Sequence, residues 1–98
     1  MVREIARIEI SPDDAAAFEA AAAQATPLFR RARGCSGMEL LRSHEMPGRY
    51  WLMVEWRTVE DHQTFRSSLD FAAWRALVSR YFVTAPDVEH GIPFGVGF

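Results

Sequence analysis

The sequence contains no lysine and no asparagine, and its only cysteine is Cys35. A single cysteine cannot form a disulfide within the chain, which favours a reducing, cytoplasmic location. No apolar run approaches the roughly 20 residues that a membrane-spanning helix needs, and the first residues do not resemble a secretory signal. We therefore expect a cytoplasmic protein with no membrane partner.

Charge of neither sign predominates. The 11 basic residues, all arginine, face 13 acidic residues, and both signs are spread along the chain to give a net charge of −2. Nucleic-acid binding needs a basic surface that neutralises phosphates, so we expect no nucleic-acid partner. The hydrophobic content of 49% is typical of globular proteins. Residues 1–98 are therefore expected to form a single domain.

Hydrophobic periodicity predicts alternating strands and helices along the chain. Apolar and polar residues alternate, as in half-buried strands, over residues 2–10 and 37–44, and further strands are expected over the mostly apolar residues 50–56 and over residues 87–92. Apolar residues recur at helical spacing between Ser11 and Gly34 and between Thr58 and Pro86. The order β-α-β-β-α-β predicts an α+β ferredoxin-like plait, in which two helices cover one face of an antiparallel sheet.

Polar residues and prolines mark the expected ends of the helices. The Ser11 and Thr58 side chains precede acidic first turns and are expected to cap the two helices. Pro27 is expected to kink or shorten the first helix near Thr26. The second helix is expected to break near Ser67 and to restart.

The strand over residues 50–56 is apolar on both faces. Its even-numbered residues face one side, whereas Trp51 and Met53 face the other. Helices can cover only one of these faces, so we expect the second face to pack against another copy of the chain, giving a dimeric α/β barrel. The alternative is that the extended, glycine-rich tail over residues 91–98 covers Trp51 and Met53. The tail is also a candidate for a place at the dimer interface.

No metal or cofactor motif is present in the sequence. The three histidines, His44, His62 and His90, lack the spacing of metal ligands. Neither Cys35 nor Ser36 has a base nearby in the sequence, and no glycine-rich phosphate or dinucleotide loop is present. We therefore expect neither a metal nor an organic cofactor.

Aromatic residues predict a pocket between the sheet and the helices. Trp56 ends the third strand on its helix-facing side, and His62 lies about one turn into the helix that covers it. Such a pocket is the default ligand site of a small domain. We expect His62 to act as a general base and Trp56 to shape the pocket. The other residues expected to line the pocket are Leu52, Phe65, Trp74, Tyr81, Phe82 and His90.

Each of these residues also has a purely structural interpretation. Trp56 and Trp74 are the kind of residue that fills a hydrophobic core. His62 can equally be a solvated residue near a helix N-terminus. His90 alternates with Val88 and Ile92, which is typical of a hydrogen-bonded core histidine.

A long segment of the chain resembles the antibiotic-biosynthesis monooxygenase (ABM) domain family. It runs from Arg49 to His62 as RYWLMVEWRTVEDH and continues with FRSS at 65–68 and FAAW at 71–74. The sequence PDVEH at 86–90 resembles the final strand of the same family. The resemblance implies a small ferredoxin-like domain that dimerises through a β-barrel.

The resemblance also implies a type of chemistry. In the quinone-forming members, which use no cofactor, a tryptophan matches Trp56, a tyrosine falls at His62 and an asparagine falls at Leu52. Those enzymes deprotonate a polyphenolic substrate, and its carbanion reduces dioxygen directly. This implies a cofactor-independent monooxygenase that oxidises a hydrophobic, aromatic or quinol-type small molecule.

Other activities of the family and its fold are alternatives. In the haem-degrading members the catalytic tryptophan falls near Phe65 and the haem-ligating histidine near Arg75, and their third site residue is an asparagine. This chain has none of the three, so haem degradation is not expected. A dimeric binding module without catalysis, or an isomerase or signal-degrading enzyme of the same fold, remains as an alternative.

Overall fold

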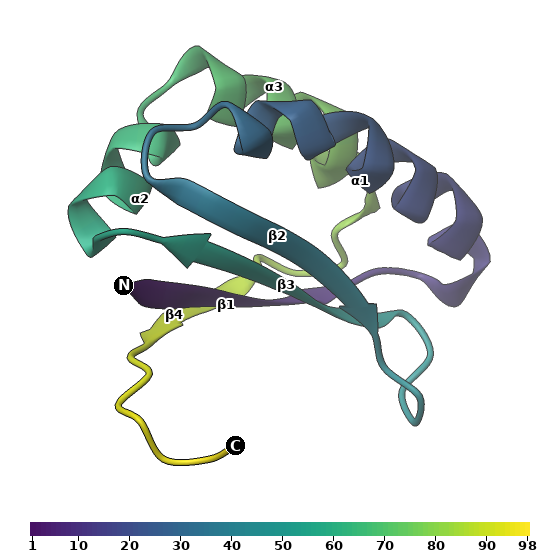
Figure 1. Cartoon of the computed structure of the whole chain (residues 1–98). Helices are drawn as coiled ribbons and strands as arrows, with labels where there is room; N and C mark the ends of the chain where they lie inside the picture. Colours follow the sequence, from purple (N-terminus) through teal and green to yellow (C-terminus); the bar gives the residue numbers. More distant parts are fainter.

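The structure, a computed structural model, describes residues 1–98 (Figure 1). Its elements follow one another as β1 (Val2–Glu9), α1 (Ala15–Arg30), β2 (Cys35–Arg42), β3 (Arg49–Trp56), α2 (Val59–Arg66), α3 (Leu69–Val78) and β4 (Asp87–Gly91). Short 3₁₀ turns precede α1, at Pro12–Asp14, and follow α3, at Ser79–Tyr81.

The four strands form one antiparallel sheet in the order β2-β3-β1-β4. All three helices lie on one face of this sheet, and the other face is left open (Figure 1). This confirms the predicted ferredoxin-like plait. The two central strands, β1 and β3, pair along their whole length, from Val2 opposite Trp56 to Glu9 opposite Arg49.

The hydrophobic core lies between the sheet and the helices. Because side chains alternate across a strand, the even-numbered residues of β3 all face the helices, and each is at most 2% exposed. Phe18 and Phe29 of α1 pack onto this face and are equally buried. Phe29 contacts Phe65 and Trp74, with ring centroids 5.0 and 5.2 Å apart, and so links α1 to α2 and α3.

One of the two expected helix caps is present. The Thr58 hydroxyl accepts a hydrogen bond from the backbone N–H of Asp61 at 3.1 Å, as predicted. The Ser11 side chain makes no cap, because the N–H of Asp14 donates to the backbone carbonyl of Ser11 at 2.9 Å. The predicted break at Ser67 is confirmed, and the Ser68 hydroxyl caps the restarted helix.

The expectation that Pro27 shortens the first helix is wrong, since α1 continues to Arg30. Pro27 lies in the last turn, where it removes one backbone donor. Its carbonyl still accepts the N–H of Arg31 at 3.2 Å, and the buried ring of Phe29 anchors the turn to the core.

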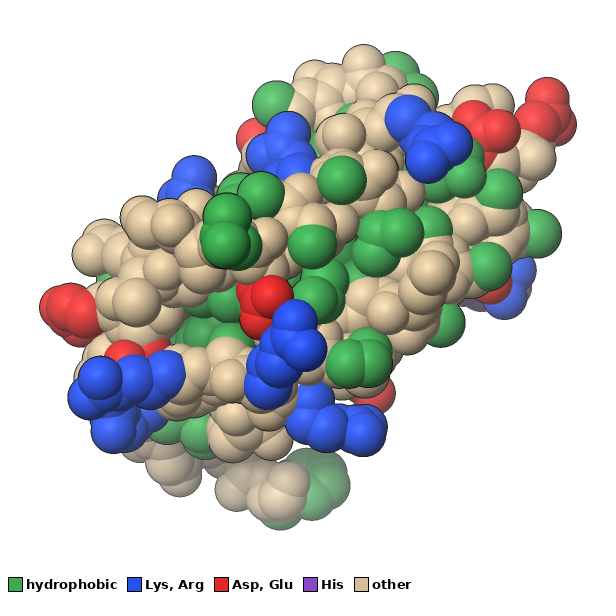
Figure 2. Space-filling view, turned by 90° about the horizontal axis from the view of Figure 1, so that it is seen from above, with side chains coloured by type: hydrophobic (Ala, Val, Ile, Leu, Met, Phe, Trp, Pro, Cys, Tyr) green, Lys and Arg blue, Asp and Glu red, His purple; other side chains and the backbone are tan.

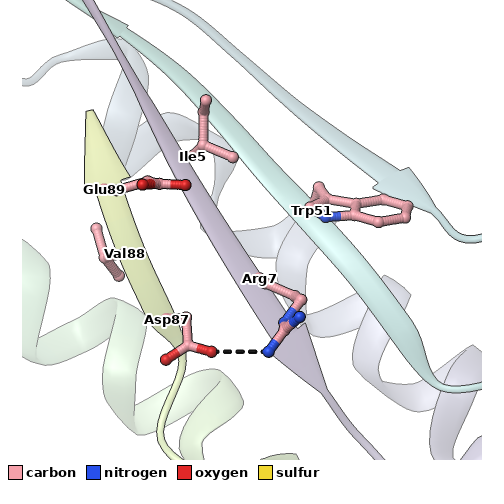
Figure 3. A pocket seen from close by; sticks show the side chains of 6 residues that line it. All are labelled: Ile5, Arg7, Trp51, Asp87, Val88 and Glu89. Atoms are coloured by element: carbon pink, nitrogen blue, oxygen red, sulfur yellow. Dashed lines mark hydrogen bonds and ion pairs between the residues drawn. The ribbon is translucent and has the colours of Figure 1, made fainter. Parts of the chain in front are cut away.

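The open face of the sheet carries Ile5, Trp51 and Met53, all half-buried. Figure 3 shows Trp51 on β3 beside Arg7 of β1, whose guanidinium pairs with Asp87 of β4 at 2.9 Å. The C-terminal tail leaves β4 on this side (Figure 1). It does not bury its own apolar side chains, because Phe94 and Val96 are both 83% exposed.

The opposite, helix-covered side presents charges of both signs without a large patch of either (Figure 2). None of the helices combines the length and apolar character needed to cross a membrane.

Candidate functional site

A carboxyl group lies at the base of the space between sheet and helices. Glu4 projects from the helix-facing side of β1 and is only 6% exposed. The sheet places it opposite Val54 on β3 and opposite His90 on β4. The sequence analysis did not select Glu4.

Two ring nitrogens contact Glu4, and both belong to residues that the sequence analysis selected. Trp56 donates its indole N–H to Glu4 Oε1 at 3.0 Å, and His62 Nε2 lies 3.1 Å from the same oxygen. On its other side, His62 Nδ1 lies 2.7 Å from His90 Nε2. Both nitrogens of His62 are thus occupied within the protein, whereas the described bonds of Glu4 use only Oε1.

Local structure fixes the orientation of His62. The Thr58 cap begins α2, and His62 follows one turn later on the face that meets the sheet. Its ring stacks on Trp56 with 5.1 Å between centroids and 13° between planes. Phe65, nearly one turn further along α2, contacts the same indole at 5.4 Å.

Burial shifts the ionisation of both partners. Desolvation, together with the charges of His90 and Arg66, lowers the pKa of His62 to about 4. Desolvation raises the pKa of Glu4, and the hydrogen bond from Trp56 and the charge of Arg66 partly offset this. His62 is therefore neutral near neutral pH and carries a single ring proton.

That proton has one position compatible with an ionised Glu4. On Nε2 it faces the carboxylate oxygen 3.1 Å away, whereas on Nδ1 it would leave the Nε2 lone pair against that oxygen. Nδ1 then accepts a hydrogen bond from His90 Nε2–H. Trp56 Nε1 and His62 Nε2 therefore both lie against one carboxylate oxygen, at 3.0 and 3.1 Å.

A cavity of about 240 Å³ opens beside this carboxylate. Its polar lining consists of Glu4, His62, Arg66 and Arg75, and most of the remaining lining is apolar. The sheet forms the floor, α2 and α3 form one wall, and the segment that enters β4 forms another.

The structure brings some of the expected pocket residues to this cavity and leaves others away from it. The expected residues that line it are Leu52, His62, Trp74 and Phe82. Trp56 is fully buried under His62, and Phe65 packs against both Trp56 and Phe29. Tyr81 packs against Phe18 instead.

His90 differs from its expected environment. It is exposed on the edge strand β4, so the expectation of a core histidine is wrong. The expected hydrogen bond is present, and its partner is His62. No cluster of three or more His, Cys, Asp or Glu side chains in the structure is arranged to hold a metal ion.

Comparison with known proteins identifies the family of the chain. Residues 1–77 match the family model described as antibiotic biosynthesis monooxygenase. The uncharacterised protein YczJ of Bacillus subtilis (strain 168) is 38% identical over 91 residues, which cover 92% of this chain and 96% of YczJ.

Solved structures agree with this match. A crystal structure from Bordetella bronchiseptica, of a protein provisionally described as an antibiotic biosynthesis monooxygenase, superimposes with a TM-score of 0.92 at 50% identity and covers 95% of this chain and 96% of that one. A similarly described protein from Caulobacter crescentus shares the fold at 21% identity, with a TM-score of 0.82 and coverage of 91% and 85%. The chain belongs to the antibiotic biosynthesis monooxygenase family.

Proposed function

We propose that this protein is a cofactor-independent monooxygenase that oxidises an electron-rich aromatic molecule with dioxygen. The observation that carries the proposal is the buried carboxyl group of Glu4 at the wall of a largely apolar cavity, held by Trp56 and His62. Such a cavity excludes water around an aromatic ligand, and the carboxylate is the base that it presents to that ligand.

Glu4 is better suited than His62 to take the proton directly. Burial raises the pKa of Glu4, and a carboxylate with a raised pKa is a stronger base than one in water. Both nitrogens of His62 already face a partner in the protein, so its role in the proposal is to direct Nε2–H at Glu4 Oε1. Oε2 is then the atom that receives the substrate proton.

The proposed reaction balances without a further reductant. Glu4 removes a proton from a phenol or from an activated CH₂ group, and the resulting anion donates an electron pair to dioxygen in single-electron steps. The new C–O bond leaves a peroxide anion, which takes the proton back from Glu4. Loss of water then gives the carbonyl, so that a CH₂ group and O₂ become C=O and H₂O.

The size of the cavity restricts the substrate. Its volume of about 240 Å³ lies below the roughly 300–1,000 Å³ of pockets for drug-sized ligands. We therefore expect a one- or two-ring substrate, such as a quinol or a naphthol, to fit better than the three rings of anthrone.

Oxygen consumption by the purified protein tests the proposal. With α-naphthol and no added cofactor, we expect dioxygen uptake and formation of the naphthoquinone, with isotopically labelled dioxygen incorporated into the new carbonyl. His62→Ala should remove most of this activity near neutral pH, because without the Nε2–H facing it the pKa of Glu4 rises further and the carboxyl group stays protonated. His44→Ala, at an exposed histidine outside the cavity, is the matched control.

The alternative of a binding module predicts a different result. Quinols and naphthols would then raise the Tm without any oxygen uptake above the rate in buffer. Uptake that His62→Ala leaves unchanged would remove the Glu4–His62 pair from the mechanism.

We also propose that the active form is a homodimer joined through the open face of the sheet. Supporting this, Ile5, Trp51 and Met53 form an apolar surface there that the helices of the same chain do not reach. The tail supports it further, since its exposed apolar residues lie on the same side. Association of two such faces would bury both sets of side chains.

A further inference from the structure

Two arginines on different helices line the cavity without any acidic partner. Arg66 ends α2 and Arg75 lies in the last turn of α3. Six other arginines form ion pairs with carboxylates within 4.0 Å, namely Arg3, Arg7, Arg31, Arg42, Arg49 and Arg57. The two guanidinium groups at the cavity therefore retain donors that the protein does not use.

The charge of the cavity is opposite to that of the chain. The whole chain has a net charge of −2, yet the lining contains two arginines and Glu4 as its only carboxyl group. His62, the remaining titratable group of the lining, is neutral near neutral pH. An anionic ligand is therefore attracted to this cavity although the protein as a whole repels it.

The surroundings of the two arginines indicate separate positions within the site. Arg66 is close enough to the reactive pair that its charge lowers the pKa of both Glu4 and His62. Arg75 lies with its Cζ 5.6 Å from the centroid of the Phe82 ring. That stacking orients the planar guanidinium and leaves the N–H groups along its edge free to form two parallel hydrogen bonds to a planar anion.

We propose that the substrate of this cavity is an aromatic carboxylate, whose carboxylate group binds Arg75 and whose ionised oxygen faces Arg66. This inference rests on the proposed function for the reaction, and it adds an acidic group to the substrate. Arg–carboxylate pairs are short, often bidentate and strong compared with neutral hydrogen bonds. The carboxylate anchors the ring, and Arg66 stabilises the negative charge that forms when Glu4 removes the proton.

Ligands with the same ring system and different charge distinguish the contribution of the carboxylate to binding from that of the ring. The probes are a hydroxynaphthoate with its carboxylate next to the hydroxyl group, its neutral methyl ester, and α-naphthol, each titrated into the protein by calorimetry at low salt. The wild-type protein should bind the carboxylate at least tenfold more tightly than the ester. Added salt should weaken the carboxylate alone, because it screens charge.

Variants that remove one arginine charge at a time show which arginine binds the carboxylate. Arg75→Gln should weaken carboxylate binding about tenfold or more and leave ester binding unchanged. Arg66→Gln should weaken carboxylate binding less and lower turnover more. Arg33→Gln removes the same charge from an exposed arginine that neither forms an ion pair nor lines the cavity, and it should change neither.

Each contrary result has a defined meaning. Equal affinity for the acid and the ester, no binding of either, or an equal loss in Arg33→Gln overturns the carboxylate proposal. Oxidation of α-naphthol with no preference for the carboxylate overturns it while supporting the proposed monooxygenase. Arginine-dependent carboxylate binding without oxygen uptake supports it and contradicts the proposed reaction.

Discussion

Glu4 and His90 lie directly opposite each other on the neighbouring strands β1 and β4. The His62 ring, which comes from α2, contacts both, through Nε2 to Glu4 and through Nδ1 to His90. A buried acid, a neutral imidazole and an exposed imidazole thus form one chain of close contacts from the cavity to the sheet edge. Burial raises the pKa of Glu4 and lowers that of His62, and both effects can be measured.

Replacing Glu4 tests whether the carboxylate is the base. Glu4→Gln keeps the size of the side chain and an oxygen that accepts the Trp56 N–H, but it cannot take a proton at neutral pH. We expect kcat to fall by roughly 10²–10⁴, the usual contribution of a general base, while ligand affinity changes little. Oxygen uptake and calorimetry measure the two quantities. Glu45→Gln, at an exposed acid without an ion pair, should behave as wild type.

His90 is expected to act as a positioning residue through His62. In His90→Ala, Nδ1 of His62 loses its donor, so the ring proton is no longer held on Nε2 facing Glu4. A carboxylate with fewer N–H donors is less stable in its charged form, and the pKa of Glu4 should rise. In a plot of kcat/KM against pH, the acid limb should therefore move to higher pH. At pH values below this limb, the variant should be about tenfold less active than the wild type.

A conservative variant distinguishes this role from a structural one. His90→Gln retains an N–H donor and should restore most of the activity and the position of the acid limb. Both variants should unfold at nearly the wild-type Tm, because His90 is exposed. An acid limb that does not move in His90→Ala contradicts the positioning role.

The fold could be predicted because the spacing of the apolar residues along the sequence distinguishes strands from helices. The same pattern contained the clue to Glu4, which was missed. Even-numbered residues of β1 face the helices, and Glu4 shares that parity with the buried Ala6 and Ile8. A charged residue on the apolar face of a strand is the signal that could have selected it.

Other parts of the site depend on packing that no local pattern encodes. Phe65 and Phe82 are both aromatic residues near helix ends, yet only Phe82 lines the cavity. The unpaired state of Arg66 and Arg75 depends on where every acidic residue lies in three dimensions. The sequence alone could predict a pocket at Trp56 and His62 but not its charge.

Glu4 and His62 should have opposite effects on the pH dependence of stability between the ordinary pKa values of Glu and His. On folding, the pKa of Glu4 rises from 4.5, so the folded state holds a proton that the unfolded state has lost. The pKa of His62 falls from 6.5 to about 4, so the folded state lacks a proton that the unfolded state holds. These two effects oppose each other.

Single variants should expose each effect. In Glu4→Gln the His62 contribution is uncompensated, and the free energy of unfolding should fall as pH drops from 6.5 towards 4, with a slope of at most about 1.4 kcal/mol per pH unit. In His62→Gln the Glu4 contribution remains, and stability should instead fall as pH rises above 4.5. Urea unfolding at several pH values measures both slopes. If the free energy of unfolding changed with pH in the same direction in both variants, the opposite effects assigned to Glu4 and His62 would be wrong.

The two helix starts provide a direct comparison of capping. Thr58→Ala removes a hydroxyl that accepts the N–H of Asp61 and should reduce the free energy of unfolding by about 1 kcal/mol. Ser11→Ala removes a hydroxyl that makes no cap, because the backbone carbonyl of Ser11 already bonds to Asp14. It should leave stability nearly unchanged. A comparable loss in both variants would show that hydroxyl capping does not distinguish them.

Trp51 provides the test of the proposed dimer. In one chain its side chain lies on the open sheet face beside Arg7, outside the buried core. Trp51→Glu should therefore leave the fold intact, while two opposed glutamates would repel each other across a symmetric interface. Sedimentation of the wild-type protein should give twice the chain mass of 11.1 kDa, and the variant should give the chain mass itself. Leu69→Glu changes an 89% exposed leucine on the helix-covered side and should remain dimeric. A wild-type protein that sediments as a monomer at micromolar concentration would rule out the open face as a stable interface.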